Sequence, residues 1–326
     1  MTPRRSRSPK PVPLLSAANW GGQGLHPRGN FEGYTRAAST QKWLEAHGGS
    51  HWAPFYTDYG VGLQKKFFDY FLKGKQNGWD QQPKVQLQIR HPGERFVLRH
   101  ENEWPLARTQ WTNFYLDPAQ LTLSAIVKNI TKTITYDAMS DGVTFSTPRL
   151  EADTEITGPS ALKLFLSSST RDADLFIILR VFDAQDNEVL FQGALDPKTP
   201  IAQGWLRASH RKLDRTLSLP YRPYHTHDEK QPLTPGEIVE LDIEIWPSCI
   251  VVPKGHRVAL TIKGKDYDHG QSAASLSNMK NPMSGCGPFM HDDPQDRPPE
   301  IFGGKVTLHF GPQYPALLLL PVIPAK

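Results

Sequence analysis

The spacing of apolar residues changes character once along this 326-residue chain, and this change constrains the fold more than any other feature. Ahead of residue 80, short apolar runs at Val12–Ala18 and Gln41–His47 predict buried strands. Each is followed by a segment that can be helical. These are Phe31–Ser39, with Asn30 as its N-cap, and Asp58–Lys73, whose apolar residues recur at three, four and seven positions. Such alternation of strand and helix is typical of the last part of a parallel, doubly wound α/β sheet.

Beyond Asn77-Gly78 apolar and polar residues alternate with period two, which predicts strands that bury one face. The predicted strands are Val85–Arg90, Trp111–Leu116, Ala161–Ser167, Leu175–Val181, Ile238–Ile245 and Val258–Ile262. Turns containing Pro, Gly and polar residues separate them. We therefore expect an α/β plus all-β chain. Its parts are a disordered basic tail (1–11), the end of an α/β-hydrolase-like sheet (12–80) and a jelly-roll β-sandwich (81–326).

Charge and cysteine content exclude several classes of protein. The net charge of +4 comes from four basic residues among the first ten, so the rest of the chain is balanced and we expect no nucleic-acid partner. Cys249 and Cys286 are the only cysteines, which argues against a disulfide framework and a cysteine-based metal site. The apolar run Ala316–Ile323 is too short to cross a bilayer. We expect a cytoplasmic protein with no membrane partner, no metal and no cofactor.

His51 is the strongest candidate for a catalytic residue. It follows a strand that ends at His47 and the turn Gly48-Gly49, and it precedes the helix from Asp58. Open α/β sheets hold catalytic groups just beyond the carboxyl ends of their strands. There a histidine can act as a general base toward a serine. The alternative is a surface or loop-packing histidine. A metal site at His47 and His51 is disfavoured, because their spacing joins ligands on a helix and the two glycines oppose one.

The serine that His51 would activate is not found in the sequence. Hydrolases of this architecture hold the nucleophile in a G-x-S-x-G turn, and no segment of the chain has this pattern. The nearest match, around Ser272, has alanine in the final place and follows the histidine, whereas the serine precedes the histidine in this architecture. We therefore interpret Ser272 as a loop residue and predict no nucleophile in this chain.

Four further residues allow two interpretations each. Trp20 and Trp52 each lie in a loop at the end of a predicted strand, so they would either line an apolar substrate pocket or pack between domains. Asp266 and Asp268 flank a tyrosine, and they would either bind a cation or a substrate amine or be solvated loop acids.

Several short motifs then combine into a familiar pattern. They are HGGSHW around His51, FFDYFLKGKQNG at the end of the second helix, and DADLFIIL, GWLRASHR, PKGHRVALTI and LLLPVIP in the β-rich part. Together they resemble the C-terminal portion of the CocE/NonD family of serine hydrolases, which includes cocaine esterases, α-amino-acid ester hydrolases and X-Pro dipeptidyl-peptidases. The resemblance extends from about Val12 to Pro324.

The resemblance implies an α/β-hydrolase unit, of which residues 12–80 would be the last part, followed by a jelly roll of galactose-binding-like type. It implies that His51 is the family's catalytic histidine. The family's acid is an Asp that would fall at Gly22, so this chain lacks it there; Glu32 and Asp58 lie nearby but off the motif. The serine has no counterpart, so we expect a truncated member.

Two functions are therefore carried forward. The first is a hydrolase of ester or amide bonds, dipeptidyl-peptidase-like or acyl-esterase-like, acting on small-molecule or peptide substrates and inactive as an isolated chain. The second is a non-catalytic β-sandwich module for binding or interaction. We also expect an exposed sheet edge, with an uncovered apolar face at Leu14–Ala18 and Trp43-Leu44, that would allow self-association or pairing with a separate serine-bearing chain.

Overall fold

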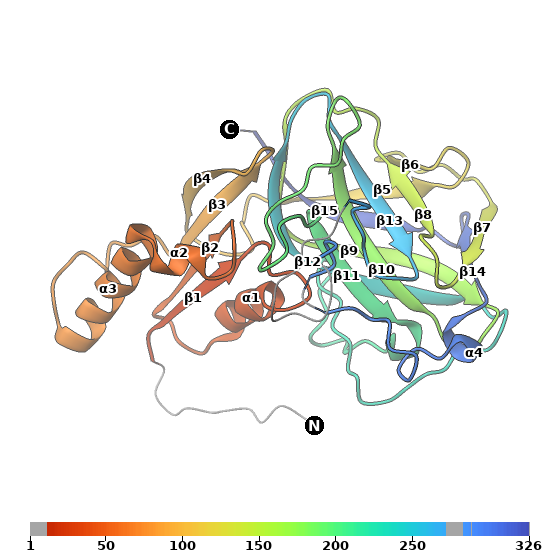
Figure 1. The fold of residues 1–326 in the computed structure, drawn as a ribbon, viewed down its shortest axis with the longest axis horizontal. Helices are drawn as coiled ribbons and strands as arrows, with labels where there is room; N and C mark the ends of the chain where they lie inside the picture. The colour runs from red at the N-terminus through yellow and green to blue at the C-terminus, as the bar shows by residue number, and fades with distance from the viewer. Residues whose placement is uncertain (1–11, 272–282, 288, 326) are drawn as a thin grey trace.

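The protein folds into two sheets that lie beside one another in the computed structural model (Figure 1), which describes residues 12–271, 283–287 and 289–325. The smaller sheet contains β1 (Leu14–Asn19), β2 (Lys42–His47), β3 (Val85–His91) and β4 (Arg95–Glu101), with helices α1 (Pro27–Arg36), α2 (Ala53–Tyr56) and α3 (Asp58–Lys73). The larger sheet contains β5 (Gln110–Asp117), β6 (Thr122–Ser124), β7 (Lys132–Asp137), β8 (Val143–Ser146), β9 (Thr154–Ser168), β10 (Asp174–Phe182), β11 (Ala202–Arg207), β12 (Val239–Val252), β13 (Arg257–Lys263), β14 (Lys305–Phe310) and β15 (Leu317–Ile323). Two short helices, η1 (Ala208–His210) and α4 (Pro299–Phe302), complete the element order.

The smaller sheet has the parallel pairing that the strand–helix alternation predicts. β1, β2 and β3 run parallel to one another, and β4 closes the sheet as an antiparallel partner of β3. Helix α1 packs on one face through Phe31 and Tyr34, against Leu44 of β2. Helix α3 packs on the other through Phe67, against Trp43. The predicted uncovered apolar face at Trp43-Leu44 is therefore wrong, because both side chains are buried under helices of this chain.

The helix ends follow local sequence signals, one of which we misassigned. Helix α3 has the predicted bounds: Thr57 Oγ1 accepts a hydrogen bond from the backbone N–H of Gly60, and Gly74 ends the helix with a left-handed φ of 66°. Helix α1 begins earlier than expected, at Pro27, whose fixed φ suits the first helical turn. Asn30 therefore lies inside the helix, where its Nδ2 donates to the carbonyl of Ala17 on β1 instead of capping.

The strand predicted at Val85–Arg90 forms, but its partner is not a strand of the β-sandwich. As β3 it pairs with β2, so the smaller sheet continues to Glu101, past the boundary expected near residues 81–84. The burial of β3 explains this placement. Val85, Gln86, Leu87, Ile89 and Arg90 are all buried, as in a parallel strand that is covered on both faces. Alternation along one strand does not reveal which strand will be its partner.

The larger sheet confirms the expected mostly-β part of the chain. Its order is β11-β10-β13-β8-β6-β5-β15-β9-β14-β7, with β12 paired to β9, and nearly all pairs are antiparallel. One apolar core, which includes residues from β9, β10, β12, β13, β14 and β15, fills its interior in the manner of a β-sandwich. The sheet is open, since β11 and β7 end the path without pairing to each other. Within the described ranges no helix is long and apolar enough to span a bilayer.

Arg90 joins the two sheets. Its side chain is fully buried, its Nε donates to the carbonyl of Cys249 on β12 at 2.8 Å, and its Nη2 donates to Ser248 Oγ and, at 2.8 Å, to the carbonyl of Ile201. The guanidinium carbon also lies 4.7 Å from the ring centroid of Phe191. Burial lowers the pKa of Arg90, because the charged form loses its hydration. Carbonyl dipoles from the β-sandwich, rather than a carboxylate, thus hold a cation supplied by β3.

Arg90→Met is expected to reduce the free energy of unfolding by about 3 kcal/mol, since it leaves buried carbonyl acceptors without donors. Urea unfolding followed by circular dichroism measures this change. Arg95→Met, at an exposed position of β4, is the matched control and should change stability by less than about 0.5 kcal/mol. Equal effects of the two substitutions would contradict a joining role for Arg90.

Candidate functional site

His51 lies in the loop between β2 and α2, at the carboxyl edge of the parallel strands. Its backbone N–H donates to the carbonyl of Ala194, at 3.0 Å. Its imidazole stacks on that of His26, with ring centroids 4.4 Å apart and an interplanar angle of 19°. The ring is therefore held by the chain on two sides, at the edge where a catalytic histidine is expected.

The surroundings of His51 favour its neutral form. Burial lowers the pKa of His51 below its usual 6.5, and repulsion from His26 and His47 lowers it further. A neutral imidazole at pH 7 is the form that accepts a proton. Its Nδ1 is buried and makes no hydrogen bond to any residue that the structure describes. The carboxylate that orients the imidazole in a serine triad thus has no counterpart in this part of the molecule.

The position where the resemblance implies an acid is tightly packed. A Cβ atom at Gly22 would lie 3.1 Å from Cδ of Pro27, 3.3 Å from the carbonyl oxygen of Asn19 and 3.5 Å from Cβ of His26. A side chain there would require Pro27 or Asn19 to give by a few tenths of an ångström. Glu32, the nearby alternative, forms ion pairs with Arg36 and Arg222 instead.

A carboxylate–histidine pair that was not predicted from the sequence lies on β2. Glu45 Oε2 lies 2.8 Å from Nδ1 of His47, and the hydroxyl of Tyr59 on α3 donates to Glu45 Oε1 at 3.3 Å. Both side chains of the pair are buried, and Nε2 of His47 has no partner among the described residues. Burial, followed by the charge of Glu45, raises the pKa of Tyr59. Alternation along β2 was the available signal, because positions 43, 45 and 47 must share one face.

A cavity of about 440 Å³ opens between these groups and the helices. Its polar wall contains Glu45, His47, His51 and Tyr59. The remaining wall is largely apolar and comes from β1, α2 and α3; it includes Leu15, Ala17, Pro54, Phe55, Leu63, Phe67 and Phe68. A concave, apolar site with a few convergent polar groups is the usual form of a small-molecule pocket.

The two tryptophans expected at a pocket have different environments. Trp52 is 53% exposed and lies on the wall of the cavity, with its ring 6.1 Å from that of His51, so its pocket role stays a prediction. Trp20 is fully buried, stacks on Phe31 and donates from Nε1 to the carbonyl of Gln88 at 2.9 Å. Trp20 does not line this cavity; its ring fills the core under α1, which agrees with the second interpretation, packing, rather than with a pocket wall.

A loop of the β-sandwich, residues 191–199, is hydrogen-bonded to the loop after β1 and to the loop after β2 that contains His51. Ala194 donates its N–H to the carbonyl of Gly21 at 2.9 Å and accepts the N–H of His51. Gly21 packs so closely that a Cβ there would lie 2.5 Å from both Gln192 O and Gly193 Cα. One residue of the β-sandwich thus connects the loop after β1 to the histidine loop after β2.

The remaining candidates lie apart from His51 or outside the described residues. Asp266 accepts from both the backbone N–H and Nδ1 of His291, and Asp268 accepts from the N–H of Gly270. Both acids therefore organise their own loop. Ser272 lies outside the described residues. Among the described residues no group of three or more His, Cys, Asp or Glu side chains is arranged to hold a metal ion.

Comparison with known proteins identifies the family. The model of the X-Pro dipeptidyl-peptidase C-terminal non-catalytic domain matches residues 77–319. A crystal structure of a CocE/NonD family hydrolase from Staphylococcus aureus superposes with a TM-score of 0.84 and 30% identity, covering 96% of this chain and 54% of that one. The chain belongs to the CocE/NonD hydrolase family and carries the X-Pro dipeptidyl-peptidase C-terminal domain.

More distant relatives agree with this assignment. A cocaine esterase from Rhodococcus sp. (strain MB1 Bresler) is 23% identical over 302 residues, covering 80% of this chain and 45% of the esterase. An α-amino acid ester hydrolase shares the fold, with a TM-score of 0.63 at 14% identity, covering 95% of this chain and 55% of the hydrolase. The chain spans about half the length of these relatives.

Gly21→Ala is expected to destabilise the protein by about 2 kcal/mol, because the new methyl group overlaps the backbone at Gly193. Thermal unfolding measures the loss. Gly29→Ala is the control: Gly29 is exposed in α1 with open space around its Cβ position, so alanine there should stabilise by about 0.5–1 kcal/mol. A neutral result at Gly21 would contradict the close packing of these loops.

The pKa of His51 is expected to lie below 6.5, and His26→Phe should raise it by removing a neighbouring charge while keeping a stacked ring. NMR titration of the imidazole nitrogens measures both values. Because the folded-state pKa is lowered, the unfolded chain binds the proton more readily, and His51 should reduce stability as the pH falls below 6.5. A value at or above 6.5 in the unmodified protein would contradict this description of the site.

Proposed function

We propose that this chain forms the histidine-bearing part of a serine hydrolase that acts on ester or amide bonds of small molecules, either acyl esters or X-Pro peptides. The observation that carries the proposal is a histidine with a lowered pKa at the carboxyl edge of a parallel sheet, on the wall of a largely apolar cavity. In this role His51 accepts the serine proton during attack and returns it to the leaving group.

The nucleophile is proposed to come from residues outside this sequence, which has no G-x-S-x-G turn. In the order β1-β2-β3-β4, the outer edge of β1 is unpaired among the described residues. A serine-bearing strand pairing in parallel with β1 would have its carboxyl end at the same edge as that of β2, close to His51. Self-association through this edge is the competing use of the same unpaired strand.

In this proposal packing takes the place of an orienting carboxylate. Glu45 is bound by His47 and Tyr59, and Gly22 leaves no side chain at the position of the family's acid. The hydrogen bond from the His51 N–H to Ala194 and the stacking on His26 fix the loop and the ring plane. Loss of a triad carboxylate costs a serine hydrolase roughly 10⁴-fold in rate, so slow turnover is expected even with the serine present.

A second candidate is a non-catalytic module for binding or interaction. The absence of a nucleophile motif favours it, as does the match to a domain family described as non-catalytic. Under this proposal the β-sandwich, of jelly-roll and galactose-binding-like type, is the part that binds a ligand or partner, and the smaller sheet only supports it.

The isolated chain is expected to hydrolyse p-nitrophenyl acetate no faster than free imidazole at the same concentration, because a general base without a nucleophile gives no covalent catalysis. Release of p-nitrophenol measures the rate. His51→Ala should leave this low rate almost unchanged. The matched control, His47→Ala on the wall of the same cavity, should leave it unchanged as well. Rapid turnover that His51→Ala abolishes would overturn the prediction and make Ser272 the first nucleophile to test.

A further inference from the structure

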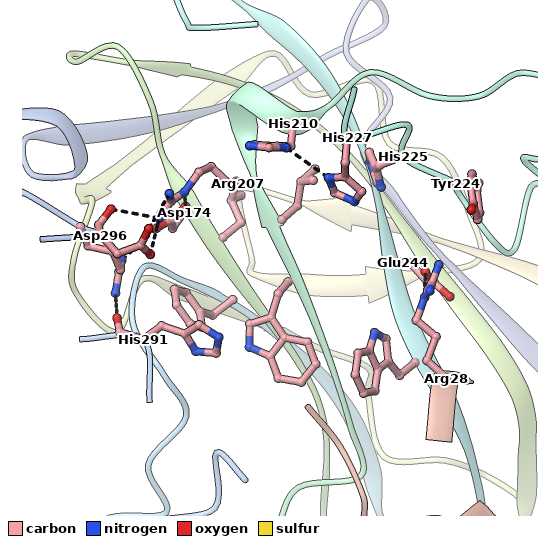
Figure 2. A pocket seen from close by; sticks show the side chains of 16 residues that line it. Arg28, Asp174, Arg207, His210, Tyr224, His225, His227, Glu244, His291 and Asp296 are labelled. Atoms are coloured by element: carbon pink, nitrogen blue, oxygen red, sulfur yellow. Dashed lines mark hydrogen bonds and ion pairs between the residues drawn. The ribbon is translucent and has the colours of Figure 1, made fainter. Parts of the chain in front are cut away.

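A second cavity, of about 550 Å³, lies on the outer face of the β-sandwich, against α1 (Figure 2). Its wall is built by α1, by the strands β10, β11 and β12, by η1, and by the loops that contain residues 224–227 and 291–297. None of these residues lines the cavity beside His51. The proposed hydrolase chemistry uses none of them.

Strand alternation explains how this face of the sandwich acquires its side chains. Along β12, Leu241, Ile243 and Ile245 point into the apolar core, so Glu244 and Trp246 point outward. The same alternation places Phe176 and Trp205 on the outer side of β10 and β11. The rings of Trp205 and Trp246 lie 5.2 Å apart at 70°, and both remain partly exposed. Partly exposed aromatic rings at outward positions of a concave face are typical of ligand sites rather than of a solvated surface.

The charged groups of the cavity neutralise one another. At one end Arg207 forms ion pairs with Asp174 at 2.8 Å and with Asp296 at 3.0 Å, and Arg297 also contacts Asp174 at 2.9 Å (Figure 2). At the other end Arg28 pairs with Glu244 at 2.7 Å. Three arginines thus face three carboxylates. His291, whose pKa is raised by its hydrogen bond to Asp266, is also paired, at 2.8 Å from that carboxylate. An anionic ligand would meet the carboxylates and a cationic ligand the arginines, so the arrangement favours a ligand without net charge.

Two of the cavity's histidines, His225 and His227, supply further uncharged donors and acceptors. His210, His227 and His225 follow one another along one wall (Figure 2), with Nδ1 of His210 3.1 Å from Nδ1 of His227. Burial lowers the pKa of His225 to about 4, and burial, followed by the charges of His210 and Arg28, lowers the pKa of His227. His225 and His227 are therefore neutral at pH 7, and each of these two offers one donor and one acceptor. Nε2 of His225 is buried without a partner among the described residues.

We propose that this cavity binds a neutral polyhydroxylated ligand, a mono- or disaccharide. The C–H face of a sugar ring packs on an indole such as Trp246, while its hydroxyls exchange hydrogen bonds with the neutral histidines and with the paired arginines and carboxylates. The cavity volume is within the range of small-molecule sites. This binding activity is separate from ester or amide hydrolysis and does not depend on it.

Isothermal titration calorimetry on the full chain, with glucose, galactose, mannose, xylose, maltose and cellobiose as probes, tests the proposal. At least one sugar is expected to bind with a Kd of about 1 mM or tighter, and Trp246→Ala should weaken it at least tenfold. Trp111→Ala is the matched control, because that tryptophan stacks on Tyr221 at a different cavity, and it should leave binding unchanged. His227→Ala provides a second variant in the same cavity if Trp246→Ala unfolds.

The charge argument has its own test with gluconate and glucosamine, which carry a carboxylate and an ammonium group on a similar sugar frame. Both should bind at least tenfold more weakly than the neutral sugar. The proposal is overturned if no sugar binds, if Trp246→Ala and His227→Ala leave binding unchanged, or if a charged analogue binds as tightly as the neutral one.

Discussion

The buried guanidinium of Arg90 is the constraint on which the remaining structure depends. An arginine cannot lose its charge to escape burial, so the fold must supply acceptors for it. Nε and Nη2 of Arg90 have them, while its Nη1 has no partner among the described residues. Here the acceptors are carbonyls of Cys249 and Ile201 in the β-sandwich, whereas the arginine itself comes from β3. The apolar cluster beside it also mixes the two parts, because Trp20, Leu87, Cys249 and Ile323 belong to the same core. Each sheet therefore supplies hydrogen-bond partners and core residues that the other needs.

The packing of the two sheets against each other determines the position of the loop that contains His51. Ala194, from the β-sandwich, bonds to Gly21 and to His51, so the loops after β1 and β2 are fixed by a residue more than 140 positions away in the sequence. His26 adds a stacked ring on the remaining side. The β-sandwich is thus a positioning element for the proposed general base, and its proposed sugar-binding face lies on different residues. One domain family can in this way support a hydrolase site without contributing a catalytic group to it.

Much of the fold could be predicted from residue patterns because its signals are local. The period-two strands and the bounds of α3 depend on neighbours within one element, and each predicted element forms, although β9 begins earlier and β12 ends later than expected. What could not be predicted depends on distant partners. Nothing in the spacing of Val85–Arg90 shows that it pairs with β2, and nothing around Trp20 shows that Phe31 and Gln88 enclose it.

The candidate site, too, has residues that the sequence predicts and residues that it does not. The place of His51 after a strand and the family motif predict its role, whereas His47 is considered only as a disfavoured metal ligand and Glu45 is not singled out, although their alternate spacing places them together. Two of the six segments that build the second cavity carry family motifs, DADLFIIL and GWLRASHR, but nothing in the sequence shows that the six meet, because ion pairs such as Arg28–Glu244 join residues far apart in the chain.

Hydrogen–deuterium exchange, read by mass spectrometry, tests most directly the claim that the β-sandwich holds the histidine loop. The N–H groups of His51 and Ala194 are bonded across the two parts of the chain. The backbone N–H groups in peptides covering residues 48–52 and 191–199 should therefore exchange at the same rate as each other. This rate should be no faster than that of the core strands β9 and β12, which exchange only by global unfolding. Rapid exchange of residues 48–52 while residues 191–199 stay protected would contradict the account.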